Sequence, residues 1–254
     1  MVATCEPHKV ENGNFPVAVE IDLDDGRYWA DPELAQKYRE QTLNFVKGQL
    51  GLDDSLVAFK SGDAIIDSFD IIGKALKGAC SVEQREKFIS ELAFFMEKSE
   101  VEQRLRLQTQ VVTAKDFWQY RVGTSAVRVV LCLNEYCNES ALSSRLQQDQ
   151  SVTALSNLTN ANICLVNDLL SVKKELAQGS LESLVPILSA MGRSAQTAAD
   201  EVTEAVNTTV TEFDAVAKTL LQCSEEREDS ETVKALVAFT AGCRNYCTGN
   251  LGWR

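Results

Sequence analysis

The spacing of proline constrains this chain more than any other feature of its sequence. The four prolines are Pro7, Pro16, Pro32 and Pro186, so none occurs between Pro32 and Pro186 or after Pro186. Because proline breaks helix interiors, long proline-free stretches with apolar residues every three or four positions favour helices over a sheet. Helices are predicted at 33–50, 63–78, 81–98, 100–121, 125–142, 150–178, 181–191, 194–222 and 230–247. The predicted fold is an all-α, single-domain helical bundle.

Two segments stand apart from the helical pattern. The β-branched run VRVVLCL at 127–133 is compatible with a strand, but its setting inside a long helical pattern favours a helix. Residues 1–20 are polar and are expected to form a mobile N-terminal segment, with the helical domain spanning 21–254. No internal repeat or low-complexity linker divides the chain.

The composition excludes several classes of function. With 25 Lys and Arg against 37 Asp and Glu, the net charge of −12 makes non-specific nucleic-acid binding a poor candidate. The only histidine, His8, argues against a histidine-based triad or a His-rich metal site. The eight cysteines contain no CxxC pair and are expected to be reduced core residues. Since no apolar run reaches transmembrane length and no signal-peptide core is present, we expect a cytoplasmic protein without stable membrane insertion.

A polar stripe follows the predicted helix at 162–178, NICLVNDLLSVKKELAQ. Asn167, Ser171 and Glu175 recur every four residues and share one face, with apolar residues on both sides of them. A helix that is apolar around most of its circumference is expected to be buried, so the stripe should face an internal cavity. An amide, a hydroxyl and a carboxylate offer only oxygen ligands, which suit Mg²⁺ completed by substrate phosphates. Periodicity alone leaves open the alternative of a solvated helix face.

The segment NDLLSVKKE within this stripe resembles a known motif. It is similar to the (N/D)DxxSxxxE metal-binding motif of the class I terpene synthase family, microbial type. Asn167, Ser171 and Glu175 stand at the three ligand positions of that motif. Lys174 matches a lysine that many family members use to contact diphosphate.

Three other segments carry the same resemblance. Arg121, in FWQYRVGTS, lies upstream of the motif at about the separation of the family's diphosphate-sensing arginine. Thr124 and Ser125 then match the linker and effector residues at a helix break, where the Gly-Thr-Ser cluster is expected to interrupt the helical pattern. KELAQGSLESLVPIL resembles the family's turn into its next helix, with Ser183 where an asparagine is usual. CTGNLGW (247–253) resembles the start of the last family motif.

The sequence departs from the family pattern near both ends. Members bear an aspartate-rich motif, and DLDDGRYWAD offers Asp24 and Asp25 for it, although Tyr28 stands where the last aspartate belongs. An acidic turn is the alternative interpretation of that segment. The chain ends at Arg254, directly after Trp253, before the family's closing Arg-Tyr pair. The resemblance therefore implies a member shortened at both ends, with incomplete N-terminal helices.

The resemblance implies a class I terpenoid synthase bundle that acts as a Mg²⁺-dependent terpene cyclase, with Mn²⁺ as the alternative ion. Such a lyase, sesquiterpene synthase-like, would ionise an isoprenyl diphosphate such as farnesyl diphosphate and cyclise the carbocation. The metal ligands would be Asn167, Ser171, Glu175, Asp24 and Asp25. Arg121 and Lys174 would bind the diphosphate, and Arg121 and Ser125 would be the catalytic residues.

Two alternatives to an active cyclase remain open at this point. One is a catalytically impaired relative that only binds diphosphate or a prenyl ligand. The other is a helical scaffold without a small-molecule site. Aromatic residues available to line a carbocation pocket are Phe94, Phe95, Phe117, Trp118 and Trp253. A monomer or homodimer is expected, as for other members of the family.

Overall fold

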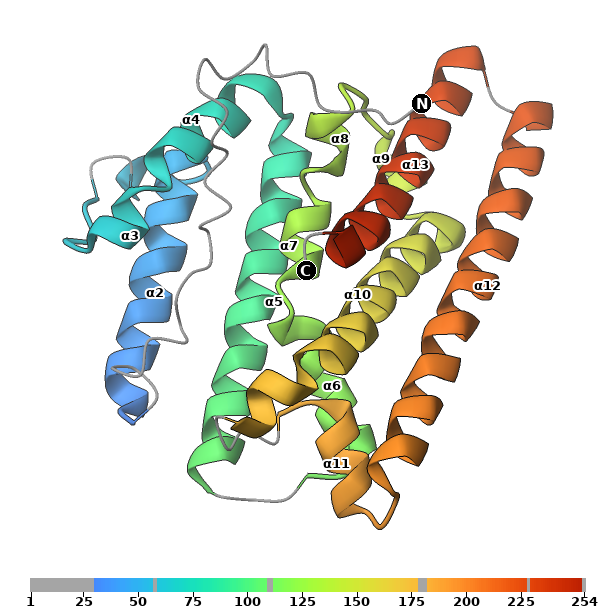
Figure 1. Ribbon diagram of the computed structural model, residues 1–254. Coiled ribbons are helices and arrows are strands. Elements are labelled where there is room, and N and C mark those ends of the chain that lie inside the picture. Colours follow the sequence, from blue (N-terminus) through green and yellow to red (C-terminus); the bar gives the residue numbers. More distant parts are fainter. Residues whose placement is uncertain (1–29, 57–58, 109–111, 178–181, 228, 253–254) are drawn as a thin grey trace.

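The computed structural model describes residues 30–56, 59–108, 112–177, 182–227 and 229–252, and every regular element in these ranges is helical (Figure 1). The predicted all-α helical bundle is therefore confirmed. In chain order the elements are α2 (Pro32–Gln49), the 3-10 helix η2 (Asp54–Leu56), α3 (Ala64–Asp67), α4 (Asp70–Ala79), α5 (Val82–Leu107), α6 (Ala114–Thr124), α7 (Val127–Leu131), α8 (Asn134–Cys137), α9 (Ser144–Gln147), α10 (Gln150–Ala177), α11 (Leu184–Ala190), α12 (Ala195–Arg227) and α13 (Ser230–Gly252). The predicted mobile segment 1–20 lies outside the described residues, so its boundary stays a prediction.

Helix α5 is longer than predicted. It runs without interruption through Ser99, where the sequence pattern predicts a division between helices at 81–98 and 100–121. Ser99 is buried, on a helix that packs against α2. The division falls later, where Thr113 caps α6 by accepting a hydrogen bond from the backbone N–H of Asp116 at 3.2 Å. The helix continues through this position because a serine has little helix-breaking effect by itself.

The segment predicted as one helix at 125–142 contains two short helices, α7 and α8. Ala126 and Glu139 adopt left-handed backbone conformations, with φ of 56° and 50°, which end regular helix on either side of this pair. Residues 127–131 are helical, so a strand at this segment is excluded. The predicted interruption after Gly123-Thr124-Ser125 is confirmed, since α6 ends at Thr124 and α7 starts at Val127.

Helix α10 lies at the centre of the bundle, and Figure 1 shows it between α12 and the α5–α6 side of the molecule. It packs against α12, α13, α11, α7 and α6. Its first turn is fixed by Asp149, whose Oδ1 accepts hydrogen bonds from the backbone N–H groups of Ser151 and Val152. Leu155 and Cys164 on α10 are fully buried. Residues of α10 are therefore placed to contact most of the other core helices.

The short helix α7 separates two hydrophobic clusters. Val129 belongs to the cluster formed with α2, α3, α4 and α5. Val127 and Leu131 belong to the cluster formed with α9, α10, α12 and α13. Val127 and Val129 are both 9% exposed and lie two residues apart, so opposite faces of one helical turn are buried in different clusters. The helix break that precedes α7 is thus held from both sides of the core.

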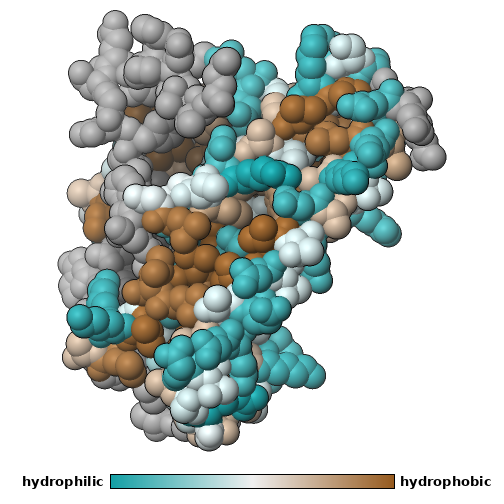
Figure 2. Space-filling view, turned by 45° about the vertical axis from the view of Figure 1, so that its right-hand side comes forward, coloured by the Kyte–Doolittle hydropathy of each residue, from teal (hydrophilic) through white to brown (hydrophobic). Residues whose placement is uncertain are grey.

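Part of the apolar surface is open. Figure 2 shows a face on which hydrophobic residues gather in a hollow between ridges of hydrophilic ones. Among the large apolar side chains that are about half exposed are Val130 on α7 and Leu170 and Leu176 on α10. Within the described ranges, no helix has the length and apolar composition needed to cross a bilayer.

Helix α13 approaches α8 so closely at Gly242 that no side chain fits. A Cβ atom there would collide with Oδ1 of Asn134, which is fully buried and donates from Nδ2 to the Phe239 carbonyl at 2.9 Å. We expect Gly242→Ala to lower the free energy of unfolding by about 1–3 kcal/mol in urea titrations, because overpacking forces the core to shift. Gly249→Ala on the same helix, with no heavy atom within 4 Å, should be neutral or stabilising. Equal losses in both variants would contradict the close approach.

Candidate functional site

Arg121 on α6 and Asp168 on α10 form a buried ion pair. Nε and Nη2 of Arg121 donate to Oδ1 of Asp168 at 2.9 and 2.7 Å. The side chain of Asp168 is 0% exposed and that of Arg121 is 14% exposed. Nη2 also donates to Oδ1 of Asn167 at 3.1 Å. The structure thus brings the predicted arginine into direct contact with the first residue of the polar stripe.

Burial and charge act against each other in this pair. Burial raises the pKa of the Asp168 carboxyl above its ordinary value, although the charge and hydrogen bonds of Arg121 act in the opposite direction. Burial acts to lower the pKa of Arg121, but the charge and hydrogen bond of Asp168, together with Cys164 and Glu102, act in the opposite direction and raise the pKa of the guanidinium overall. Arg121 is therefore a permanent cation. Because its side chain is only 14% exposed, water competes little with an anionic ligand for its N–H groups.

The second oxygen of Asp168 connects the pair to α11. Oδ2 accepts a hydrogen bond from the backbone N–H of Leu184, the first residue of that helix, at 3.0 Å. The preceding residue, Ser183, is 0% exposed and makes no capping hydrogen bond with its side chain. Its Oγ has no hydrogen-bond partner among the described residues. One buried carboxylate therefore links α6, α10 and α11.

The helix break at Ser125 is stabilised by Asn160 on α10. Oγ of Ser125 donates to Oδ1 of Asn160 at 2.9 Å and accepts from the backbone N–H of Val127 at 3.3 Å. Nδ2 of Asn160 donates to the carbonyl of Val122 at 2.7 Å, near the end of α6 where helical partners are lost. Asn160 is 2% exposed. The buried amide of Asn160 therefore stabilises the break, because it bonds the Val122 carbonyl before the break and the Ser125 hydroxyl at it.

The three expected metal ligands follow one another along α10 and are each half-buried. Oγ of Ser171 donates to the backbone carbonyl of Asn167 at 2.7 Å, an arrangement in which the hydroxyl oxygen can still accept. Oε2 of Glu175 is buried and has no hydrogen-bond partner among the described residues. A buried carboxylate oxygen is costly without a partner, and a cation can supply one. The oxygen donors of Asn167, Ser171 and Glu175 therefore fit a hard divalent cation.

The end of α10 is more open than the sequence pattern predicts. Val166 and Asp168 are buried, but Leu170 is 50% exposed and Leu176 is 54% exposed. Lys174, the predicted diphosphate ligand, is also exposed. The prediction of a buried helix therefore holds for the middle of α10 and is wrong for its last turns. A helical wheel cannot show where neighbouring helices end, and this is why it missed the difference.

Asp24 and Asp25 lie outside the described residues, and so do Trp253 and Arg254. In the described part of the chain, no group of three or more His, Cys, Asp or Glu side chains could hold a metal ion. The stripe on α10 is not such a group, because Glu175 is its only carboxylate and its other two oxygen donors are an amide and a hydroxyl.

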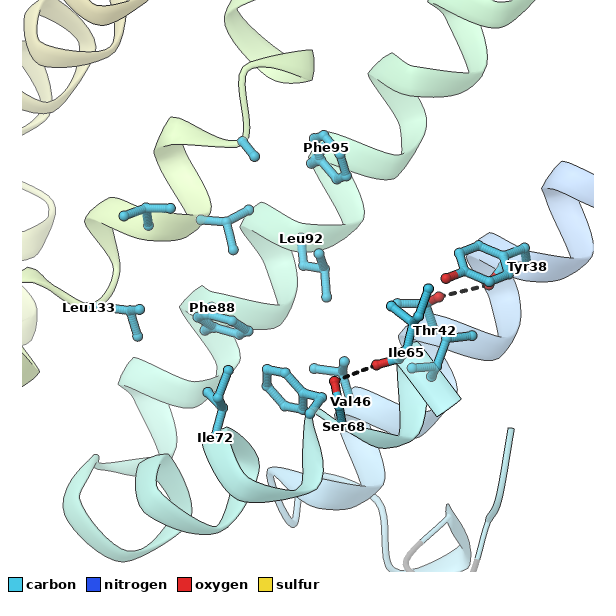
Figure 3. Close-up of a pocket in the computed structure, with 15 residues that line it drawn as sticks. Tyr38, Thr42, Val46, Ile65, Ser68, Ile72, Phe88, Leu92, Phe95 and Leu133 are labelled. Carbon is cyan, nitrogen blue, oxygen red and sulfur yellow. Dashed lines mark hydrogen bonds between the residues drawn. The ribbon is translucent and has the colours of Figure 1, made fainter. Parts of the chain in front are cut away.

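An apolar cavity of about 100 Å³ lies beside the helix break, between α2, α3, α4, α5 and α7 (Figure 3). Its wall includes Ala126, the residue after Ser125, and aromatic side chains, namely Tyr38, Phe69, Phe88 and Phe95. In Figure 3, Phe88, Leu92 and Phe95 from α5 and Tyr38 from α2 border one space.

Besides the phenol of Tyr38, two aliphatic hydroxyl groups line this cavity, and each donates a hydrogen bond to the backbone. Oγ1 of Thr42 donates to the Tyr38 carbonyl at 2.9 Å and Oγ of Ser68 donates to the Ile65 carbonyl at 2.6 Å (Figure 3). Each bond closes within the side chain's own helical segment. The cavity is therefore lined mainly by hydrocarbon and ring surface, and the protons of Thr42 and Ser68 are turned to the backbone.

The other predicted aromatic residues lie elsewhere. The ring of Phe94 lies 5.1 Å from Nζ of Lys98 and 4.9 Å from the guanidinium carbon of Arg128. Phe117 is fully buried and packs edge-on against Tyr120. Trp118 lines an open groove between α6, α10 and α12. Of the four that the structure describes, only Phe95 borders the apolar cavity.

Sequence reasoning missed the roles of Asp168 and Asn160. Asp168 was visible as the second residue of NDLLSVKKE, but its wheel position at the edge of the stripe does not distinguish a buried ion pair from a solvated carboxylate. Asn160 lies two helical turns before Asn167 and so shares its face, which is a signal that could have found it. Both residues contact α6, which the pattern within α10 alone could not reveal.

Comparison with known proteins gives a family match over most of the chain. Residues 30–212 match the family described as terpene synthase family 2, C-terminal metal binding. The sesquiterpene cyclase hepA of Aspergillus oryzae is 30% identical over 241 residues, covering 92% of this chain and 65% of that protein. Germacrene A synthase of Nostoc punctiforme is 26% identical, covering 87% of this chain and 65% of that protein. The chain thus spans slightly less than two thirds of the length of these two relatives.

Solved structures share the fold at lower sequence identity. Germacradien-4-ol synthase from Streptomyces citricolor superposes with a TM-score of 0.77 at 15% identity, covering 91% of this chain and 72% of that one. Linalool/nerolidol synthase from Streptomyces clavuligerus, in complex with 2-fluorogeranyl diphosphate, gives a TM-score of 0.74 at 17% identity, covering 88% and 76%. At these identities the likeness establishes the arrangement of helices alone.

Proposed function

We propose, from the fact that the chain belongs to terpene synthase family 2, that it is a Mg²⁺-dependent terpene cyclase acting on an isoprenyl diphosphate. The observation that carries the proposal is the contact of Arg121 with Asn167, on the helix where Glu175 keeps a buried oxygen without a described partner. A fixed cation beside an oxygen-only ligand set suits a diphosphate that arrives with its metal. The relatives named as a sesquiterpene cyclase and a germacrene A synthase favour farnesyl diphosphate as the substrate.

The metal site would be formed by Asn167, Ser171 and Glu175, with Asp24 and Asp25 as proposed ligands from another segment. Bound Mg²⁺, or Mn²⁺ in its place, would neutralise charge on the leaving diphosphate. Glu175 contributes the negative charge of the set, and its unpartnered oxygen gives the cation a preformed ligand. Asn167 and Ser171 contribute neutral oxygens, so one divalent cation held by the three α10 ligands alone would keep a net positive charge that attracts a diphosphate anion.

Arg121 and Lys174 are the proposed diphosphate ligands. Arg121 donates from Nε and Nη2 within the protein, and no described residue accepts from its Nη1. This edge can give a charge-assisted hydrogen bond to a diphosphate oxygen. Lys174 is exposed near the end of α10, where it can reach a ligand entering from solvent. Ser125 is the proposed effector, because its carbonyl lies at a helix break and can face developing positive charge.

The apolar cavity beside the break is the proposed site for hydrocarbon of the substrate. Ala126 joins the cavity wall to Ser125, so hydrocarbon in the cavity would start close to the diphosphate site. The aromatic ring faces of this wall can stabilise a cation. A cavity of about 100 Å³ accommodates part of an isoprenoid chain, since apolar cavities of roughly 150 Å³ bind benzene.

The decisive experiment measures diphosphate release from isoprenyl diphosphates of ten, fifteen and twenty carbons, with and without Mg²⁺, and identifies products by gas chromatography and mass spectrometry. A cyclase releases diphosphate only with the metal and yields cyclic hydrocarbon or alcohol. Metal-dependent binding without turnover would instead support the impaired relative. Neither binding nor turnover with any of the three substrates would leave only a helical scaffold.

Filling the cavity should shift the preferred chain length. We expect Val129→Phe to change the ratio of kcat/KM for ten-carbon over fifteen-carbon substrate by at least about tenfold in favour of the shorter one, because lost space discriminates against the longer chain. The matched control is Val127→Phe, which enlarges an equally buried residue of α7 that faces the other core cluster. A similar ratio shift in both variants would remove the cavity from the substrate site.

A further inference from the structure

We propose that Asp168 is a positioning residue for the diphosphate reaction, holding the guanidinium of Arg121 in the orientation that receives the diphosphate. The inference rests on the proposed function and assigns a role to a residue outside the expected ligand set. The contact carries it, because Asp168 uses one oxygen for two hydrogen bonds from Arg121.

The geometry fixes the carboxylate itself. Oδ1 accepts both bonds from Arg121, while Oδ2 accepts the backbone N–H of Leu184 at 3.0 Å. A main-chain donor at the start of α11 cannot follow a rotating side chain, so the plane of the carboxylate is set by the fold. With 0% exposure, water does not compete for these bonds. Arg121 is thereby held at two nitrogens before any ligand binds, which is the condition for preorganised binding.

The hydrogen bond to Asn167 gives this positioning a second consequence. Nη2 of Arg121 lies 3.1 Å from the same Oδ1 that would ligate the metal. A cation at that oxygen repels a guanidinium resting on it, so metal loading favours the bonds to Asp168 over the bond to Asn167. Asp168 then keeps Arg121 beside the metal site when the contact with Asn167 weakens.

Charge and positioning predict opposite effects of removing the carboxylate. If Asp168 acted only as a negative charge near an anion site, its removal would tighten diphosphate binding by Coulomb's law. If it positions Arg121, the same change loosens the guanidinium and weakens binding. The sign of the change in affinity therefore separates the two roles.

The test is isothermal titration of the full chain with inorganic pyrophosphate at saturating Mg²⁺. We expect Asp168→Asn, which keeps the shape of the side chain, to weaken pyrophosphate binding on the order of tenfold to a hundredfold, the range for hydrogen bonds to charged groups. Unchanged or tighter binding would overturn the inference. Asp168→Glu retains the charge but shifts the carboxylate by one methylene, and it should also weaken binding.

A double-mutant cycle checks that Asp168 acts through Arg121. Arg121→Gln and the double variant Arg121→Gln/Asp168→Asn should bind pyrophosphate equally weakly, whereas additive losses would contradict the inference. Glu135→Gln removes another buried carboxylate, which holds Gln84 and the Leu142 N–H. It should lower the thermal midpoint without changing pyrophosphate affinity.

The outcomes for the inference and for the proposed function are distinguishable. Wild-type protein that binds no pyrophosphate with Mg²⁺ contradicts the proposed function, and the positioning role is overturned with it. Wild-type binding that Asp168→Asn and Asp168→Glu leave intact overturns the positioning role alone. Circular dichroism and thermal melts of each variant identify loss of folding, and Asp168→Glu, which keeps Arg121, supplies the affinity comparison if Asp168→Asn unfolds.

Discussion

Glu175→Gln is expected to reduce Mg²⁺-dependent diphosphate release by at least about a hundredfold, because it removes the negative charge of the proposed metal ligands on α10. The substitution keeps the length and shape of the side chain. It replaces one carboxylate oxygen with an NH₂ group, which cannot ligate a cation. Oε2 of Glu175 is buried without a described partner, so the loss of charge should not cost stability in the metal-free protein. Turnover and stability are therefore expected to change independently.

Two measurements on this variant separate a metal ligand from a structural carboxylate. Addition of Mg²⁺ and pyrophosphate should raise the thermal midpoint of the wild type and leave that of Glu175→Gln nearly unchanged, since only binding to the folded state stabilises it. The control is Glu204→Gln, an exposed position on α12, which should retain both turnover and the metal-induced shift. A Glu175→Gln protein with wild-type turnover would remove this residue from the metal site.

The fold was largely predictable because helix signals are local. The lack of proline between Pro32 and Pro186 and the recurrence of apolar residues indicate helices. In the described part of the chain, the regular elements are indeed helices. The Gly-Thr-Ser cluster marked the break after α6, since glycine and serine weaken a helix within one turn. The length of α5 was not predictable in this way, because Ser99 has a nearly neutral helix propensity and its burial is a tertiary property.

The candidate site was predictable only as far as one helix face defines it. Spacing put Asn167, Ser171 and Glu175 on one side of α10, and resemblance to a family added Arg121. Contacts between helices are a tertiary property, so neither source revealed that Asp168 bridges α6 and α11. For the same reason the pattern could not show that Asn160 holds the break at Ser125. The residues that orient the site are thus harder to find from sequence than the residues that would contact the ligand.

Arg121→Met is expected to lower the free energy of unfolding by about 3–5 kcal/mol, the usual cost of leaving one member of a buried ion pair without its partner. Asp168 is 0% exposed, so water cannot replace the two hydrogen bonds that it loses. Urea unfolding followed by circular dichroism measures this loss, provided that the m-value stays unchanged. The surface pair Arg193–Glu201 gives the scale for comparison, and Arg193→Met should cost less than about 1 kcal/mol because both of its side chains are well exposed.

The double variant Arg121→Met/Asp168→Leu distinguishes an unpaired charge from poor packing. Removing both charges eliminates the buried carboxylate, so most of the lost stability should return, as it does when buried ion pairs are replaced by apolar residues. Recovery should stop short of the wild type by about 1–3 kcal/mol, because the Leu184 N–H then lacks its acceptor. Diphosphate release should remain as low as in Arg121→Met, since the proposed diphosphate ligand is still missing. A double variant less stable than Arg121→Met would show that shape, and not charge, dominates this contact. Stability largely regained without activity would instead show that apolar residues can replace Arg121 and Asp168 in the fold but not in ligand binding.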